Sequence, residues 1–215
     1  MLAPVAERQA ALEQRFPEWR PRRLEQLLDD IAAEFPDRPY VITDERTWTY
    51  AQIRDWSVQV AQGLAGLGVQ PGEHVATVLA NFGEYVAVKY GIARAGATCI
   101  PINFLNRRAE LGYVLGQSDA VALVTMDRFR DLDYLTALDE LAPGWESGGG
   151  GDALPRLRDV VVFATAADGG RAGARTLDDL TTNAPDVTLR KDFPRMRQPM
   201  CSTPQARPAS PRVCC

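Results

Sequence analysis

Short apolar runs alternate along the chain with segments whose apolar residues recur at helical spacing. Residues 74–80 are apolar and β-branched, which is typical of a strand buried on both faces. Residues 81–96 repeat apolar side chains every three or four positions and end at Gly96, a residue that favours a left-handed helix cap. Residues 97–101 form a second apolar run. This strand, helix and strand predict a right-handed parallel crossover around which the chain is organised.

The same alternation continues on both sides of the crossover. Two β-prone arms joined by a polar turn predict a hairpin of residues 40–43 and 47–50. Residues 147–152, Ser-Gly-Gly-Gly-Gly-Asp, are expected to form a flexible loop without packing side chains. Further strands are predicted at 120–125 and 159–164, and helices at 3–20, 22–35, 51–67, 107–116, 131–141 and 177–180. This order predicts an α/β fold with a mostly parallel sheet flanked by helices.

Length and composition are those of an ordinary globular protein. The chain has 215 residues, enough for one domain, of which 46% are hydrophobic and 24% charged. No apolar run approaches the roughly 20 residues of a membrane helix. The first residues lack the basic stretch and apolar core of a secretory signal. A cytoplasmic protein without a transmembrane segment is therefore expected.

Charge and cysteine are unevenly distributed. Residues 193–215 hold four arginines and no acid, so residues 1–192 carry 20 basic and 28 acidic side chains. An acidic body argues against nucleic acid as a partner. Three of the four cysteines, Cys201, Cys214 and Cys215, also lie in this terminal segment, where nothing completes a set of metal ligands. Cys99, inside an apolar run, is expected to be a small buried hydrophobe.

Few residues suggest chemistry. His74 is the only histidine, so a metal site or a Ser-His-Asp triad has almost nothing to build on. Its position at a strand entrance favours a structural role. Gly63, Gly66 and Gly68 superficially resemble a dinucleotide-binding loop, but they fall at the end of a predicted helix, which favours helix termination.

Other candidate residues also have ordinary structural interpretations. Trp48, Tyr50 and Trp56 could form a stacking platform for a ligand, although aromatic residues in such positions more often belong to a core. Arg107 and Arg108 open a predicted helix and favour a surface role over an anion site. Three acidic pairs in helical or turn settings favour solvated polar surface over metal binding; they are Asp29 with Asp30, Asp131 with Asp133, and Asp178 with Asp179. The residues alone indicate an α/β domain without a visible active site.

The order of short motifs is more informative. The motifs are Phe35-Pro-Asp-Arg-Pro-Tyr-Val-Ile42, Arg46-Thr-Trp-Thr-Tyr-Ala-Gln-Ile53, Gly66-Leu-Gly-Val-Gln-Pro-Gly-Glu-His-Val-Ala76, Leu79-Ala-Asn-Phe-Gly-Glu-Tyr85, Gly91-Ile-Ala-Arg-Ala-Gly-Ala97 and Pro101-Ile-Asn103. Together they resemble the start of the AMP-forming acyl-CoA synthetases, a superfamily that also contains luciferases and the adenylation domains of peptide synthetases. The resemblance is close over residues 24–125 and loose over residues 126–190.

The resemblance implies part of the N-terminal domain of an adenylate-forming enzyme. Such enzymes use ATP to convert a carboxylic acid into an acyl-adenylate, and then pass the acyl group to coenzyme A. ATP, Mg²⁺ and coenzyme A are therefore implied for full-length members. Their phosphate loop, Thr-Ser-Gly-Thr-Thr-Gly-x-Pro-Lys-Gly, is expected shortly after residue 190, and this chain lacks it there. The chain thus offers no catalytic, cofactor-binding or metal-binding residue of the family and is expected to be inactive.

Residues 193–215 do not continue the α/β pattern. By composition they resemble a disordered basic tail. However, the possible codons of residues 199–215, read from the third base of the Pro199 codon, permit Asp-Val-Leu-Tyr and then Thr-Ser-Gly-Thr-Thr-Gly-Leu-Pro-Lys-Gly-Val-Leu. This is the missing phosphate loop in its expected place. A slip of the reading frame between about residues 189 and 198 is therefore predicted.

This interpretation divides the chain into an N-terminal extension (1–20), a partial AMP-binding domain (21–192) and an out-of-frame, disordered tail (193–215). The parent would be an acyl-CoA synthetase acting on a small-molecule carboxylic acid. An aryl-CoA ligase or a peptide-synthetase adenylation domain stays open, and residues 100–104 favour fatty-acid or aryl-CoA ligases. A non-catalytic binding module with a functional basic tail is the alternative of another class. Strands without their downstream partners are expected to leave apolar surface and open edges exposed.

Overall fold

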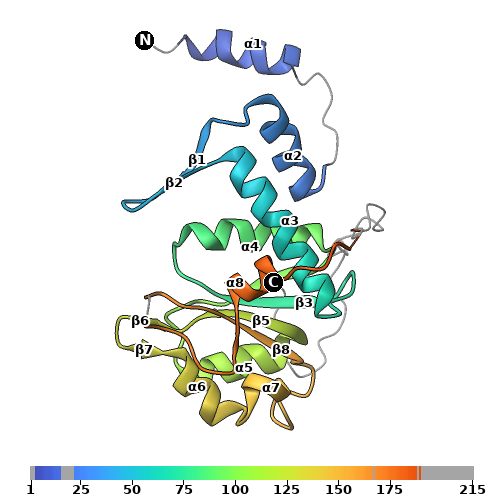
Figure 1. Cartoon of the computed structure of the whole chain (residues 1–215). Helices are drawn as coiled ribbons and strands as arrows, with labels where there is room; N and C mark the ends of the chain where they lie inside the picture. Colours follow the sequence, from blue (N-terminus) through green and yellow to red (C-terminus); the bar gives the residue numbers. More distant parts are fainter. Residues whose placement is uncertain (1–2, 16–21, 167, 188, 190–215) are drawn as a thin grey trace, which may run out of the picture.

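The fold is built on a parallel sheet whose strands are mainly the apolar runs of the sequence. The structure is a computed structural model that describes residues 3–15, 22–166, 168–187 and 189. The sheet has the strand order β4-β3-β5-β8-β9, and all neighbouring pairs are parallel (Figure 1). The strands are β3 (His74–Val78), β4 (Thr98–Pro101), β5 (Ala120–Met126), β8 (Asp159–Phe163) and β9 (Arg175–Thr176). The crossover from β3 through α4 (Gly83–Arg94) to the parallel strand β4 is confirmed.

Helices cover both faces of this sheet. α3 (Tyr50–Gly66) and α4 lie on one face, and α5 (Arg108–Ser118), α6 (Tyr134–Leu141) and α7 (Trp145–Gly148) lie on the other (Figure 1). All seven residues of β5 are buried, as are the last four of β3 and the middle three of β8. The expectation of exposed apolar sheet surface is therefore wrong for these three central strands, which stay covered on both faces. In the part of the chain that the structure describes, β4 and β9 are the edge strands.

Glycines allow the helices above the sheet to approach closely. A Cβ added at Gly91 of α4 would lie 2.5 Å from Val60 of α3. A Cβ at Gly63 of α3 would lie 2.3 Å from the carbonyl oxygen of Leu180 in α8 (Leu177–Thr182). Contacts this short exclude any larger residue without a shift of the helices.

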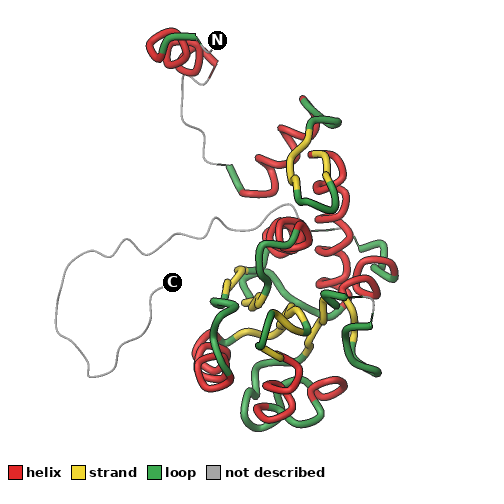
Figure 2. Tube along the Cα trace, turned by 90° about the vertical axis from the view of Figure 1, so that its left-hand side faces the viewer, coloured by secondary structure: helices red, strands yellow, loops and turns green. Residues whose placement is uncertain are grey.

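A second, smaller core lies beside the sheet. α2 (Leu24–Glu34) packs there with a hairpin of β1 (Pro39–Ile42) and β2 (Thr47–Thr49), whose antiparallel pairing confirms the predicted hairpin. Leu28, Trp48 and Ile53 are the buried residues of this core. α1 (Val5–Arg15) buries no residue and lies at one end of the molecule (Figure 1 and Figure 2). It contacts α2 through Arg15, whose guanidinium pairs with the carboxylate of Glu34 at 2.6 Å.

The helix predicted to begin at residue 131 begins instead at Tyr134. Residues 132–133 form β7, which pairs antiparallel with β6 (Arg128–Phe129). Asp133 caps α6, because its carboxylate accepts a hydrogen bond of 2.8 Å from the amide of Thr136. The apolar periodicity therefore predicted the helix, and the capping acid determines where it starts.

The middle of the glycine-rich run at residues 147–152 is packed, contrary to the expectation of a flexible loop without packing. Its first two residues belong to α7, and Gly149 and Gly150 are buried. The amide of Gly150 donates a hydrogen bond of 2.7 Å to the carbonyl of Leu157. A Cβ at Gly150 would lie 2.2 Å from the carbonyl oxygen of Leu154, so the absence of side chains permits close backbone packing.

Two sequence predictions fall outside the described residues. These are the tail at residues 193–215 and the end of the first predicted helix at residues 16–20. Within the described ranges, none of the helices combines the length and the apolar character needed to span a membrane.

Candidate functional site

The carboxyl ends of parallel strands are where α/β proteins most often bind ligands. In this sheet all five strands end at one edge, and the segments that follow β3, β4, β5 and β8 are called here the carboxyl-edge loops. They comprise residues 79–82, 102–107, 127–133, 164–166 and 168–174.

Asp127 is the polar centre of the carboxyl-edge loops. It directly follows β5, and its side chain is 3% exposed. Its Oδ1 accepts hydrogen bonds from the amide of Thr165 (3.0 Å), the hydroxyl of Thr165 (2.7 Å) and the amide of Arg128 (2.7 Å). Its Oδ2 accepts a bond of 3.0 Å from the amide of Gly170. One carboxylate therefore joins the loop after β5 to the loop after β8.

The environment of Asp127 favours the ionised acid. Burial opposes ionisation, but the hydrogen bonds from Thr165, Gly170 and Arg128 outweigh it and hold the pKa of the carboxyl below its usual value. A general acid or base needs a pKa near the working pH and a free path to its substrate. A buried carboxylate engaged by four donors is instead suited to positioning the backbone.

Phenylalanine rings lie at the ends of four parallel strands. They meet as two edge-to-face pairs, Phe82 with Phe163 at 5.2 Å and Phe104 with Phe129 at 5.1 Å between ring centroids. The hydroxyl of Tyr134 donates a hydrogen bond to the carbonyl of Phe104, and burial together with the charge of Asp131 raises the pKa of this tyrosine to about 12. The edge thus combines an aromatic surface with one buried carboxylate.

Arg171 anchors the far end of the loop after β8. Its guanidinium donates to both carboxylate oxygens of Asp139 at 2.8 and 3.0 Å and to Glu146 at 3.0 Å. It also lies 5.8 Å from the ring centroid of Trp145, whose indole N–H donates to Asp139 at 2.9 Å. The hydrogen bond from Arg171 lowers the pKa of Asp139. These contacts attach the loop to α6 and α7.

A polar cleft of about 470 Å³ lies at the opposite, amino edge of the sheet. It is lined at the start of β8 by Arg158 and Asp159, and across from them by Arg175 of β9 and Asp179 of α8. Arg158 is bound to Glu73 at 2.7 Å, and burial raises the pKa of Asp159. The lining carries both signs of charge and favours no particular class of charged ligand.

His74 lies at this amino edge and has a structural partner. Its Nδ1 is 2.6 Å from the carbonyl oxygen of Ser118, which joins the start of β3 to the end of α5. This contact supports the structural role predicted for it.

The glycines that resemble a dinucleotide loop do not form one. Gly63 and Gly66 lie within α3, the first against Leu180 and the second with its Cβ position 2.8 Å from Pro185. Gly68 follows the helix with a φ of 79°, the left-handed conformation of a helix end. Helix termination is confirmed for Gly68, while Gly63 serves close helix packing.

The acidic pairs, for which polar surface was favoured over metal binding, lie mainly in ion pairs and at helix starts. Asp29 pairs with Arg94 at 2.6 Å, Asp30 with Arg22 at 3.1 Å, and Asp131 with Arg107 at 3.3 Å. Asp179 accepts from the amide and hydroxyl of Thr176 and caps α8, in whose first turn Asp178 also lies. Among the described residues no cluster of three or more His, Cys, Asp or Glu side chains could hold a metal ion.

The three aromatic candidates form core contacts. Trp48 is 6% exposed and stacks on Trp56 at 6.5 Å, and Tyr50 stacks on Tyr40 at 4.2 Å between ring centroids. The interpretation as core is confirmed.

The two arginines and the cysteine behave as predicted. Arg107 and Arg108 are exposed and form ion pairs with Asp131 and Glu140. Cys99 is partly buried, and burial raises the pKa of its thiol, as suits a small hydrophobe rather than a nucleophile.

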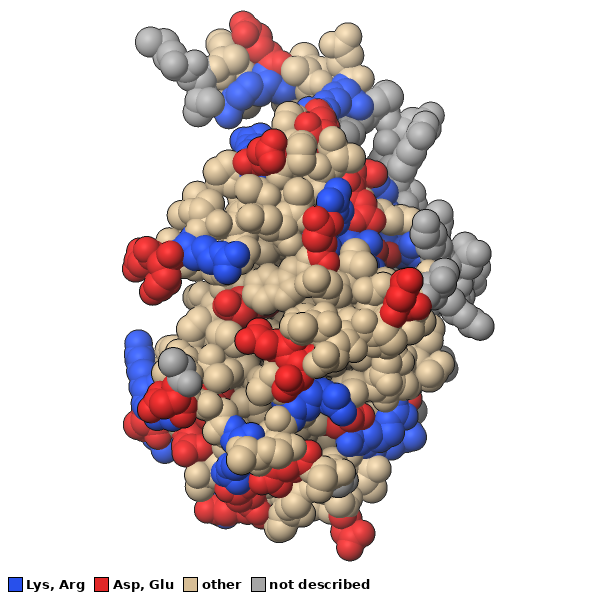
Figure 3. Space-filling view, viewed as in Figure 1, with Lys and Arg blue, Asp and Glu red and all other residues tan. Residues whose placement is uncertain are grey.

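Sequence reasoning missed Asp127. The available signal was an acidic residue placed directly after a fully apolar strand, at the edge where polar loops assemble. On the face drawn in Figure 3, basic and acidic side chains are interspersed, and the described residues form no continuous basic area there.

Comparison with known proteins places this geometry in a family. The family model of the AMP-binding enzymes matches residues 28–171. YngI of Bacillus subtilis, provisionally named an acyl-CoA synthetase, is 38% identical over 119 residues, which cover 54% of this chain and 22% of that protein. Triostin synthetase I of Streptomyces triostinicus is 34% identical over 174 residues, which cover 72% of this chain and 32% of that protein.

A solved structure shares the fold. The apo structure of Mycobacterium smegmatis MbtA superposes with a TM-score of 0.64 at 29% identity, covering 89% of this chain and 33% of that one. This chain therefore spans a third or less of the length of these relatives. Because the family model matches more than half of its residues, the chain belongs to the family of AMP-binding enzymes.

Proposed function

We propose that this chain is the N-terminal part of an AMP-forming acyl-CoA synthetase and that polypeptide 1–215 does not itself form an acyl-adenylate. The parent would join a small carboxylic acid to coenzyme A through an acyl-adenylate, with ATP and Mg²⁺. The observation that carries the proposal is the phosphate-loop sequence permitted by the shifted codons of residues 199–215. We further propose residues 1–20 as an extension, 21–192 as the partial domain, 193–215 as an out-of-frame tail, and the cytoplasm as the location.

The expected inactivity has an electrostatic reason. Stabilising the charge of ATP phosphates requires preorganised amides, hydroxyls and a lysine, and such stabilisation is usually the largest single contribution to catalysis. In the printed frame, residues 193–215 supply four arginines without the glycine-rich backbone that would cradle a triphosphate. Asp127, the best-organised acid at the carboxyl edge, is engaged with backbone donors.

ATP–pyrophosphate exchange tests the proposal. Purified polypeptide 1–215 and a frame-restored version of the gene product would be assayed with a panel of aliphatic and aromatic carboxylic acids. We expect no exchange above background from 1–215 and acid-dependent exchange from the frame-restored protein. Robust exchange by 1–215 would refute its inactivity, and a frame-restored protein that folds without exchange would refute the assignment of the parent.

A related parent is the second candidate. Peptide-synthetase adenylation domains stay beside fatty-acid and aryl-CoA ligases as alternative parents, because the motifs of residues 35–103 resemble the superfamily that contains all of them. Adding amino acids to the panel and assaying acyl-CoA formation with coenzyme A separates these. A peptide-synthetase domain would exchange with amino acids or aryl acids but would not release an acyl-CoA thioester, whereas a CoA ligase would release one.

A non-catalytic binding module with a functional basic tail is the alternative of another class. Deleting residues 193–215 distinguishes the two: an out-of-frame tail is dispensable, whereas a binding module would lose its partner. Pull-downs with the full chain and the deleted chain would show the difference.

A further inference from the structure

α2 contributes few apolar side chains to the core it covers. It packs against α3 and α4, and its buried apolar residues are Leu28 and Ala32, each 1% exposed. Leu28 reaches the small core and packs there with Trp48 and Ile53. Elements with few buried apolar contacts open locally at a lower free energy than the rest of a fold.

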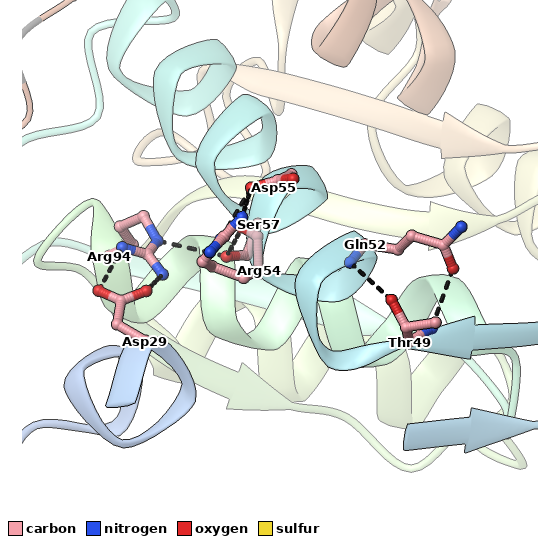
Figure 4. A network of polar contacts seen from close by, with 7 residues as sticks. All are labelled: Asp29, Thr49, Gln52, Arg54, Asp55, Ser57 and Arg94. Carbon is pink, nitrogen blue, oxygen red and sulfur yellow. Dashed lines mark hydrogen bonds and ion pairs between the residues drawn. The ribbon is translucent and has the colours of Figure 1, made fainter. Parts of the chain in front are cut away.

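A polar clamp holds α2 against its neighbours (Figure 4). The guanidinium of Arg94 in α4 donates to both carboxylate oxygens of Asp29 in α2, at 2.6 and 3.1 Å. Its Nε donates to the hydroxyl of Ser57 in α3 at 3.2 Å, and that hydroxyl donates to the carbonyl of Arg54 at 2.6 Å. The clamp therefore joins three helices through one arginine.

The two partners of the clamp differ in exposure. The side chain of Arg94 is 12% exposed, whereas that of Asp29 is 43% exposed. Removing Asp29 would leave a largely enclosed guanidinium without its carboxylate, which is costly. The exposed carboxylate also lets dissolved ions weaken the pair as ionic strength rises.

The chain after α2 is anchored independently of the clamp. The amides of Tyr50 and Ala51 donate to the carbonyls of Arg38 and Pro36, both at 3.1 Å. The start of α3 is fixed by Thr49, whose hydroxyl accepts from the amide of Gln52 at 3.3 Å, while the side chain of Gln52 accepts from the amide of Thr49 at 2.9 Å (Figure 4). α2 can therefore move about its C-terminal end while α3 stays in place.

We infer that α2 is an electrostatically locked strap. When the pair between Asp29 and Arg94 breaks, α2 swings about residues 35–38 and uncovers the apolar surface of Trp48 and Ile53. The main sheet stays folded during this opening, because its core is built from other residues.

Hydrogen exchange of polypeptide 1–215, followed by mass spectrometry, tests the strap. Asp29→Asn weakens the clamp while keeping the side-chain size, and Asp55→Asn is the matched control, since Asp55 pairs with Arg54 at 2.7 Å on the exposed side of α3. We expect the amides of α2 to exchange at least about tenfold faster in Asp29→Asn, with β3, β5 and β8 unchanged. Raising the salt concentration from about 0.05 to about 0.5 M should accelerate hydrogen exchange of the α2 amides more in the unaltered chain than in Asp29→Asn.

Three results would overturn the proposed strap. One is that the α2 amides exchange at an unchanged rate in Asp29→Asn, and another is that Asp55→Asn accelerates their exchange equally. The third is faster exchange throughout the main sheet in Asp29→Asn, or failure of this variant to fold. Either would mean that the clamp stabilises the whole fold and does not control α2 alone.

Discussion

At the scale of single residues, one buried carboxylate joins two loops at the carboxyl edge of the sheet. Asp127 gathers four hydrogen bonds at the carboxyl edge, and Gly169 leaves room for it, because a Cβ there would lie 2.2 Å from Oδ2. The environment of Asp127 explains why its role could not be predicted from the sequence alone. Apolar periodicity locates β5, but three of the four hydrogen bonds come from residues 165 and 170, which only the fold brings beside residue 127.

Replacing this acid should destabilise the chain. In Asp127→Asn an amide N–H group faces backbone donors, and we expect the free energy of unfolding to fall by about 2 kcal/mol. Urea denaturation monitored by circular dichroism would measure it. Asp131→Asn is the control, because that side chain is 74% exposed and its ion pair should contribute less than about 0.5 kcal/mol. Equal losses in both variants would contradict the role of Asp127.

The same substitution has a defined dependence on pH. Because the folded pKa of Asp127 is lowered, its contribution to stability is present above the unfolded value of about 3.9 and is lost as pH falls through the folded pKa. The difference in unfolding free energy between the unaltered chain and Asp127→Asn should therefore shrink below about pH 4. A difference that stays constant down to pH 2 would argue against ionisation of this side chain as the cause.

At the scale of elements, the periodicity of apolar residues correctly predicted the longer strands and helices. The four longer strands of the sheet, the hairpin and the α3 and α4 helices have strong periodicity and appear where expected. The two-residue strands β6, β7 and β9 were not predicted, since so few residues carry no periodic signal. The prediction for the glycine-rich run was wrong for a related reason. Composition shows that side chains are absent there, but it does not show that other backbone segments pack closely against these glycines.

Two glycine substitutions separate packing from helix propensity. Gly63→Ala places a Cβ 2.3 Å from the carbonyl of Leu180, so we expect a loss of about 1–3 kcal/mol from overpacking α3 against α8. Gly116→Ala on exposed α5 meets nothing closer than 3.9 Å and should gain about 0.5–1 kcal/mol. Thermal or urea unfolding of both variants would compare them. Destabilisation by both would mean that helix packing is not what distinguishes the sites.

At the scale of the whole molecule, two cores and a family match define what the chain is. The main sheet is covered on both faces, and a smaller core of α2 and the hairpin is attached beside it. Membership of the AMP-binding enzymes follows from residues 28–171, a region without a family phosphate loop in the printed frame. The scaffold was therefore predictable from motif order, whereas no residue of this chain could be assigned a catalytic role from its sequence.

The nucleotide sequence around codons 185–230 would show directly whether the reading frame slips before the phosphate loop. We expect the alternative frame to encode Thr-Ser-Gly-Thr-Thr-Gly-Leu-Pro-Lys-Gly opposite residues 203–213 and then to stay open into further synthetase sequence. A stop codon within that frame, or codons for unrelated residues at those positions, would contradict it.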